Sequence, residues 1–363
     1  MLKENRLFCS VPFNRLFIYG HRFVRPAGPT IKHTFFRPAG DVHMCCWLDT
    51  SPLGNIEHEL VEEVWNGQKA QEIRRTILDG TFQYCSRENC PYLQTLSYDV
   101  QRREKVKDKD LETVIENNLT ILPFLPREII CCYDRSCNLS CPSCRKHVIV
   151  ETDRREEILA IQSKLESQLL KNARVLTISG DGDAFGSPFY RRWLQTMSRA
   201  KMPHLKQITL HTNAQLWTCE IWNTIPMEIR EIINSTIISI DAATAHTYSI
   251  NRRGGDFEKL LNNLEFISLL RTGGPLKHLR ISMVVQMNNF MEMPAFIRLG
   301  KSFGADVVSF SKIMNWGAFS DGEYRERAIH LPEHPCHFEF INMLADDIFC
   351  DPIVDLGNLS SLH

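Results

Sequence analysis

The chain has 363 residues, of which 43% are hydrophobic and 23% are charged, with a formal net charge of -1 at pH 7. This composition indicates a globular protein with a sizeable core, and the balanced charge gives no electrostatic case for binding nucleic acid or an anionic membrane. No apolar run approaches the ~18 residues of a membrane span, and the N-terminus lacks the features of a secretory signal. We therefore expect a cytoplasmic protein, in which the thirteen cysteines are metal ligands and buried thiols rather than disulfides.

Residues 1–95 are rich in turns, and one amphipathic helix is predicted over 61–78. Thiols before and after this helix form a compact pattern: Cys45, Cys46, Cys85 and Cys90. The pattern indicates a metal site, to which Cys9 or a C-terminal thiol could add a ligand. Zinc in a small cysteine-rich knuckle, and thiols without any metal, are the two alternative interpretations.

Residues 96–126 read as a linker, because 101–110 is a run of charged residues typical of a solvated segment. Beyond it, strand-like and helix-like periods alternate over 127–320, which indicates parallel strands joined by crossover helices. The predicted strands are 129–133, 174–179, 207–213, 236–241, 278–286 and 306–311. The predicted helices are 154–172, 189–201, 219–233, 257–270 and 294–303.

Three cysteines follow the first of these strands, in the segment 136–145, Ser-Cys-Asn-Leu-Ser-Cys-Pro-Ser-Cys-Arg. Three thiolates on one loop, here Cys137, Cys141 and Cys144, can hold three corners of a cubane iron–sulfur cluster and leave the fourth iron open. Structural zinc is the rival interpretation, but it prefers four ligands, usually in two separated pairs, and no fourth ligand lies nearby in the sequence.

This C-x3-C-x2-C segment and the strands and helices after it resemble the radical S-adenosylmethionine (radical SAM) superfamily over residues 127–320. The resemblance implies an α/β fold, a partial (β/α)6 TIM-type barrel with a small Cys-rich module before it. It also implies that Cys137, Cys141 and Cys144 ligate a 4Fe–4S cluster and that S-adenosyl-L-methionine chelates the fourth iron. Reductive cleavage of this cofactor would yield a 5′-deoxyadenosyl radical.

The same resemblance implies contacts to S-adenosylmethionine (SAM) at the carboxyl ends of successive strands, where barrel enzymes place their active sites. The turn 179–185, Ser-Gly-Asp-Gly-Asp-Ala-Phe, stands where the family usually has Gly-Gly-Glu-Pro, with Asp183 in place of the glutamate that holds the SAM amino group. The predicted cofactor contacts are Asp181, Gly182, Asp183, Asn213, Ser239, Asp241, Arg253 and Gln286.

The cysteine pattern of residues 1–95 is similar to the SPASM or twitch module, which carries an auxiliary cluster in radical SAM enzymes. Under that resemblance Cys45 or Cys46, with Cys85 and Cys90, would ligate a possible second iron–sulfur cluster.

Residues 321–363 are expected to cap the barrel mouth, because 330–337 contains three histidines and two prolines in a rigid loop. Cys336 in this loop and Cys350 beyond it are thiols that could donate hydrogen to a substrate radical or complete the N-terminal cluster.

The resemblance predicts an oxygen-sensitive enzyme that abstracts hydrogen from a C–H bond, with a flavodoxin- or ferredoxin-type electron donor. We expect the substrate to be a carbohydrate-like compound or another small metabolite, and the reaction to be an epimerisation or a dehydrogenation. Modification of a peptide or protein is the alternative within the class. From another class, a non-catalytic iron–sulfur or zinc protein on a degenerate barrel is the remaining alternative.

Overall fold

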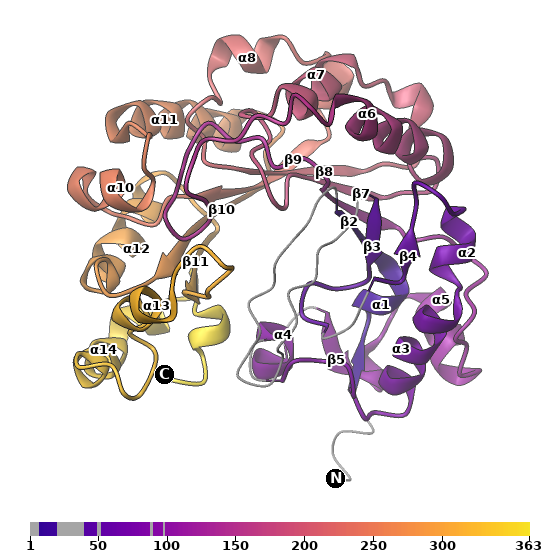
Figure 1. Cartoon of the computed structure of the whole chain (residues 1–363), viewed down its shortest axis with the longest axis horizontal. Helices are drawn as coiled ribbons and strands as arrows, with labels where there is room; N and C mark the ends of the chain where they lie inside the picture. The colour runs from indigo at the N-terminus through magenta and orange to yellow at the C-terminus, as the bar shows by residue number, and fades with distance from the viewer. Residues whose placement is uncertain (1–6, 20–39, 49–51, 88–89, 97–98) are drawn as a thin grey trace.

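The computed structural model describes residues 7–19, 40–48, 52–87, 90–96 and 99–363. Its centre is one ten-stranded sheet, in the order β12-β11-β10-β9-β8-β7-β6-β2-β3-β4, beside a two-stranded sheet of β1 and β5 (Figure 1). The large sheet contains β2 (Arg15–Tyr19), β3 (Asp41–His43), β4 (Gly54–Asn55), β6 (Glu128–Cys132), β7 (Val175–Ile178), β8 (Gln207–Thr212), β9 (Ile233–Ser239), β10 (His278–Val285), β11 (Val307–Lys312) and β12 (Val354–Asp355).

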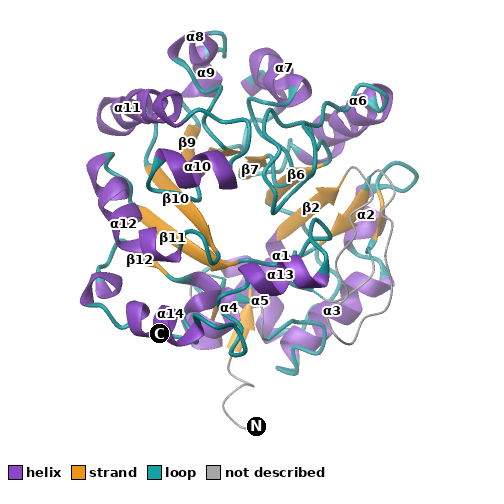
Figure 2. Cartoon of the chain, turned by 60° about the vertical axis from the view of Figure 1, so that its left-hand side comes forward, coloured by secondary structure: helices purple, strands orange, loops and turns teal. Residues whose placement is uncertain are grey.

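Strands β6 to β11 are the six parallel strands predicted for the barrel, each paired with the next. They curve, with helices on their outer side (Figure 2). The helices after β6 are α6 (Arg155–Lys164), the π-helix η3 (Leu165–Leu169), α7 (Pro188–Thr196), α8 (Cys219–Asn223), α9 (Met227–Arg230), α10 (Ala245–Asn251), α11 (Phe257–Gly273) and α12 (Met293–Ser302). Because the strand order is linear, the barrel is open, and the prediction of a partial α/β barrel is confirmed.

The strands have one apolar and one more polar face, as expected for a sheet covered by helices on one side. Leu176, Ile208 and Ile281 point into the main hydrophobic core and are at most 1% exposed. Their neighbours in sequence, such as Thr177 and Ser282, lie on the opposite, inner face. The inner face is therefore the surface that the barrel offers to a ligand.

Three strands of the N-terminal residues, β2, β3 and β4, belong to the barrel sheet. Strand β2 pairs with β6 in parallel, so that Phe17 lies opposite Ile130 and Tyr19 opposite Cys132, and β3 and β4 follow in antiparallel order. The sheet is thus continuous between the N-terminal residues and the barrel.

The helices of the first 126 residues are α1 (Val11–Asn14), α2 (Val61–Trp65), α3 (Gln68–Leu78), α4 (Pro91–Thr95) and α5 (Lys109–Glu116). The single helix predicted over 61–78 is thus wrong, because the chain is extended at Gly67, with φ -62° and ψ 165°, where α3 begins. The helix predicted over 219–233 is likewise two helices, since Pro226 cannot donate the backbone hydrogen bond that a continuous helix needs.

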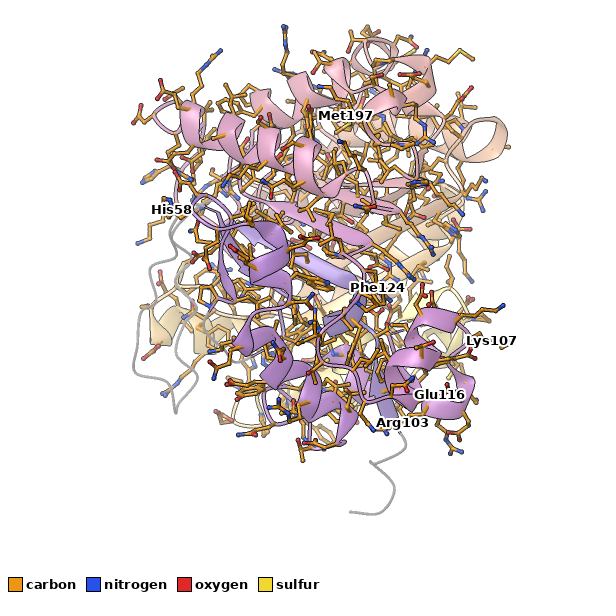
Figure 3. All side chains as sticks on the ribbon, turned by 90° about the vertical axis from the view of Figure 1, so that its right-hand side faces the viewer. His58, Arg103, Lys107, Glu116, Phe124 and Met197 are labelled. Atoms are coloured by element: carbon orange, nitrogen blue, oxygen red, sulfur yellow. The ribbon has the colours of Figure 1, made fainter. Side chains whose placement is uncertain are left out.

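The segment predicted as a linker packs on the N-terminal helices. It contains β5 (Val100–Arg102), which pairs with β1 (Leu7–Cys9), as well as α5. Trp65 Nε1 donates to the carbonyl oxygen of Phe124 at 2.8 Å, and Phe124 is labelled in Figure 3. These contacts fix the segment that leads into β6.

The C-terminal segment contains α13 (Asp321–Arg327), α14 (His337–Leu344) and β12, which extends the parallel sheet beyond β11. The capping role expected for it stays a prediction. Among the described helices, none has the length and apolar composition that crossing a bilayer requires.

Candidate active site and a four-cysteine pocket

The loop with the three cysteines leaves the carboxyl end of β6 and is held in place by Asp134. This carboxylate is fully buried and accepts hydrogen bonds from the backbone N–H of Ser136 at 2.9 Å and from its hydroxyl at 2.7 Å. It also accepts from the hydroxyl of Ser187, which caps the N-terminus of α7. Asp134 therefore ties the loop to the next β–α unit, a function that its place in the sequence did not reveal.

Each of the three cysteine sulfurs accepts a hydrogen bond from a nearby side chain. Asn213 Nδ2 lies 3.6 Å from Cys137 Sγ, and Arg252 Nη1 lies 3.7 Å from Cys141 Sγ. Arg145 Nε and Nη2 both lie 3.3 Å from the Sγ atom of Cys144. Donors of this kind stabilise the thiolate form, which is the form that binds iron.

The thiols are otherwise in surroundings that disfavour a free thiolate. Burial raises the pKa of Cys137 to about 12, and the nearby Asp183 carboxylate adds to that effect. A positive group must offset this desolvation, and an iron cluster with the two arginines fits that requirement. Among the described residues, no three His, Cys, Asp or Glu side chains form a group that could hold one metal ion directly. A cubane cluster differs from a single ion because its thiolates bind separate irons.

A buried ion pair lies directly behind the cysteine loop. Arg252 Nη2 is 2.8 Å from Asp241 Oδ2, and their side chains are 12% and 2% exposed. Asp241 also accepts from the backbone N–H of Val284 at 2.7 Å. Arg252 thus joins Cys141 to the carboxyl ends of β9 and β10, whereas the sequence had favoured its neighbour Arg253.

Removing this arginine is expected to destabilise the protein. In Arg252→Met, the carboxylate of Asp241 stays buried without its partner, which should lower the free energy of unfolding by about 3–5 kcal/mol. The exposed Arg253→Met is the matched control and should change it by less than about 0.5 kcal/mol. Urea unfolding of the reconstituted proteins measures both. Equal losses in the two variants would contradict the assignment, whereas recovery in the double variant Arg252→Met/Asp241→Asn would support it.

Asp183 holds two strand ends together rather than presenting a free acceptor. Its Oδ1 accepts from the N–H groups of Phe185 and Gly186 at 2.9 and 2.7 Å. Its Oδ2 accepts from the Thr212 hydroxyl and the Asn213 N–H at 3.0 and 2.6 Å. Four donors fill the acceptor sites of a carboxylate. The carboxylate thus fixes the glycine-rich turn against the end of β8, and the contact of Asp183 with the SAM amino group stays a prediction.

The glycine-rich turn packs directly on the cysteine loop. A Cβ atom at Gly182 would lie 2.5 Å from the carbonyl oxygen of Asp134 and 2.8 Å from that of Ser136. Arg145 Nη2 donates to the carbonyl oxygen of Asp181 at 3.2 Å, which adds a second link between the two segments. The structure thus brings Asp181 and Gly182 to the cysteine loop, and their role as cofactor contacts stays a prediction.

The remaining predicted contacts are more scattered. Arg253 is directed away from the thiols, with Nε 3.1 Å from the Ser140 hydroxyl and Nη2 2.8 Å from the Lys146 carbonyl oxygen. Gln286 is buried, and its Oε1 accepts from Arg327 at 3.3 Å. Arg253 thus contacts the cysteine loop at Ser140, whereas Gln286 bonds to Arg327.

Hydroxyl groups of neighbouring strands stand side by side on the inner face. Ser239 of β9 pairs with Ser282 of β10, their hydroxyl oxygens 3.4 Å apart, and Ser282 pairs in turn with Ser309 of β11. On the other side of the barrel, Thr177 pairs with Thr209. These rows give the inner face hydrogen-bonding groups for a polar ligand.

Four cysteines line a small apolar pocket at the N-terminal end of the molecule. Cys9 enters from β1, Cys45 from the turn after β3, and Cys85 and Cys90 from the segment before α4. The pocket walls also include Trp47, Phe82 and Val100. The arrangement therefore supplies the fourth thiol, Cys9, that the compact sequence pattern lacked.

The four thiols are close enough to influence one another. Burial, with a contribution from the nearby Cys45 thiol, raises the pKa of Cys85 to about 12 and that of Cys90 to about 11. Four thiols that line one buried pocket fit a fully Cys-ligated cluster, in which each thiolate binds a separate iron. Cys46 does not line this pocket, and its thiol instead interacts with that of Cys45. The structure thus favours Cys45 over Cys46 as the ligand.

The structure does not place Cys336 among the strand-end residues. It precedes α14 and packs at the edge of the main core, where its backbone N–H donates to His334 Nδ1 at 3.1 Å. Cys336 and Cys350 are also absent from the lining of the four-cysteine pocket.

Residues 30–91 match the family model of SPASM, described as an iron–sulfur cluster-binding domain. The match confirms the predicted SPASM module before the barrel, and with it an iron–sulfur cofactor for this part of the chain. Cys9, which completes the pocket, lies outside the matched residues. No curated protein matches the sequence.

Several solved structures are similar to the chain at low identity. SuiB of Streptococcus suis bound to S-adenosylmethionine is 14% identical, with 81% of this chain and 61% of that chain covered and a TM-score of 0.42. The protein anSMEcpe with bound AdoMet is 16% identical, with 63% and 60% covered and a TM-score of 0.42. The radical S-adenosylmethionine methyltransferase TsrM of Kitasatospora setae, with cobalamin and a 4Fe–4S cluster, is 11% identical, with 51% and 36% covered and a TM-score of 0.37. The matched region thus spans less than two thirds of each of these chains.

Proposed function

We propose that the chain is a radical SAM enzyme that binds a 4Fe–4S cluster through Cys137, Cys141 and Cys144. The observation that carries the proposal is the cysteine loop at the carboxyl end of β6, where each sulfur accepts a hydrogen bond from a fixed side chain. When cluster and SAM are bound, they supply a one-electron cleavage that yields a 5′-deoxyadenosyl radical able to abstract hydrogen from a C–H bond.

The chain's own residues position and shield this chemistry. Asp134 and Asp183 hold the cysteine loop and the glycine-rich turn against each other, so that the cluster ligands and the strand ends keep one geometry. Arg252 and Arg145 supply positive charge at two of the sulfurs. Such charge favours the reduced state of a cluster and compensates the burial of its ligands.

We propose further that Cys9, Cys45, Cys85 and Cys90 ligate the auxiliary cluster of the SPASM module. All four line one buried pocket, so that no open iron is needed to complete the set. A fully ligated cluster has no iron open to a substrate, so this cluster would transfer electrons. A structural zinc ion in this pocket is the alternative that iron analysis distinguishes.

Two substrate classes fit the proposed reaction. SuiB was solved bound to the precursor peptide SuiA, and anSMEcpe was solved with the Cp18Cys peptide. A peptide is accordingly our first substrate proposal. The rows of hydroxyls on the inner face favour a second, a hydroxylated small molecule that forms hydrogen bonds with Ser239, Ser282 and Ser309.

Protease treatment separates the two classes. A cell extract that stimulates formation of 5′-deoxyadenosine should lose this effect after digestion if the substrate is a peptide, and keep it if the substrate is a small molecule.

The open iron can be tested spectroscopically. SAM added to the anaerobically reduced protein should change the electron paramagnetic resonance spectrum of the first cluster, because its amine and carboxylate would bind that iron. The change should persist in Cys9→Ser, which alters only the proposed auxiliary site. A spectrum of the wild-type protein that does not respond to SAM would argue against the proposal and for a non-catalytic iron–sulfur protein.

A further inference from the structure

Two further thiols lie on the inner face of the sheet and ligate neither proposed cluster. Cys132 ends β6 and forms a small apolar cluster with Phe17 and Tyr19 of β2, against which Cys46 and Ile130 pack. This cluster is separate from the main core, to which the alternate residues of the same strands belong. We call Cys46 and Cys132 the inner-face thiol pair.

Cys132 lies against the glycine-rich turn. A Cβ atom at Gly180 would be 2.2 Å from Cys132 Sγ, so that only glycine leaves room for the thiol there. Gly180 directly precedes Asp181 and Gly182, which pack on the cysteine loop. The Cys132 thiol therefore stands between the apolar inner face and the turn proposed to receive SAM.

Cys46 connects the same cluster to the four-cysteine pocket. Its thiol interacts with that of Cys45, a proposed ligand of the auxiliary cluster, while its side chain packs against the cluster that contains Cys132. The pair thus lies between the two proposed metal sites, on the face where a substrate radical would form.

Resting on the proposed function, we propose that Cys132 of the inner-face thiol pair donates a hydrogen atom to a carbon radical formed in the barrel. The S–H bond of Cys132 breaks, a C–H bond forms, and Cys132 becomes a thiyl radical. One electron from a one-electron reductant and one proton from water then restore the thiol. This donor takes the place of Cys336, which the structure puts at the edge of the main core.

The donor can be tested without knowing the substrate. When no substrate is present, the 5′-deoxyadenosyl radical is itself the carbon radical in the barrel. Reconstituted protein is exchanged into D2O, so that thiols carry deuterium, and incubated anaerobically with SAM and dithionite, without thiol reductants. Mass spectrometry should find deuterium in part of the wild-type 5′-deoxyadenosine. In Cys132→Ala and the isosteric Cys132→Ser, the deuterated fraction should fall to that of the H2O reaction.

Matched controls locate the source of the deuterium. Tyr19→Phe removes the exchangeable phenol hydrogen of the same cluster, and Cys219→Ala removes an exposed thiol on α8. Both should keep the wild-type fraction. Unchanged deuterium in both Cys132 variants, with iron content and 5′-deoxyadenosine yield retained, would overturn the inference while the proposed function stands. A wild-type protein that forms no 5′-deoxyadenosine would overturn the proposed function itself.

Discussion

The Cys137→Ala/Cys141→Ala/Cys144→Ala variant is expected to lose roughly four irons per chain and all cleavage of SAM, on the usual Cys ligation of such clusters. The fold should persist, because the loop is also held by Asp134 and by the bond from Cys137 N–H to the Ile149 carbonyl oxygen at 2.9 Å, which involves backbone alone. Iron and sulfide analysis with circular dichroism measures both. An unchanged iron content, or zinc in place of iron in the anaerobic wild-type protein, would contradict the first cluster.

The second large effect concerns the four-cysteine pocket. Cys9→Ser should remove or strongly reduce the iron that remains in the triple variant, because Cys9 supplies one of four thiols in that pocket. The matched change Cys46→Ser should retain this iron, since Cys46 lies outside the pocket lining. Iron counting in the triple-variant background separates the two sites.

Two results would contradict the second assignment. If Cys46→Ser loses this iron and Cys9→Ser retains it, Cys46 rather than Cys9 is the fourth ligand. A triple variant that is folded but holds zinc, or no metal, would leave one iron–sulfur cluster in the protein and make the N-terminal pocket structural.

The sequence was sufficient for the barrel because its signals are local. Each of the six strands is a short apolar run, and parallel strands with crossover helices follow from their alternation with helical periods. The breaks at Gly67 and Pro226 were missed because the apolar period continues across both residues, although both are known helix breakers. Strand β2 could not be assigned to the barrel edge, because its pairing with β6 joins residues more than a hundred positions apart.

The candidate site could be read from the sequence where its residues are adjacent, and not where folding brings them together. The three cysteines of the loop are readable from their spacing, whereas Cys9 joins Cys85 and Cys90 only through the pairing of β1 with β5. Arg252 is indistinguishable from Arg253 in sequence, and only the turn of the chain after α10 decides which one faces Asp241. The four donors to Asp183 come from two different strand ends, so its hydrogen bonds could not be read from the sequence.

The most direct test of the central claim is the formation of 5′-deoxyadenosine from SAM. Anaerobically reconstituted wild-type protein with dithionite should release 5′-deoxyadenosine and methionine in equal amounts, and the Cys137→Ala/Cys141→Ala/Cys144→Ala variant should release neither. Wild-type protein that holds its iron and yet releases no 5′-deoxyadenosine would contradict the account and identify a non-catalytic iron–sulfur protein.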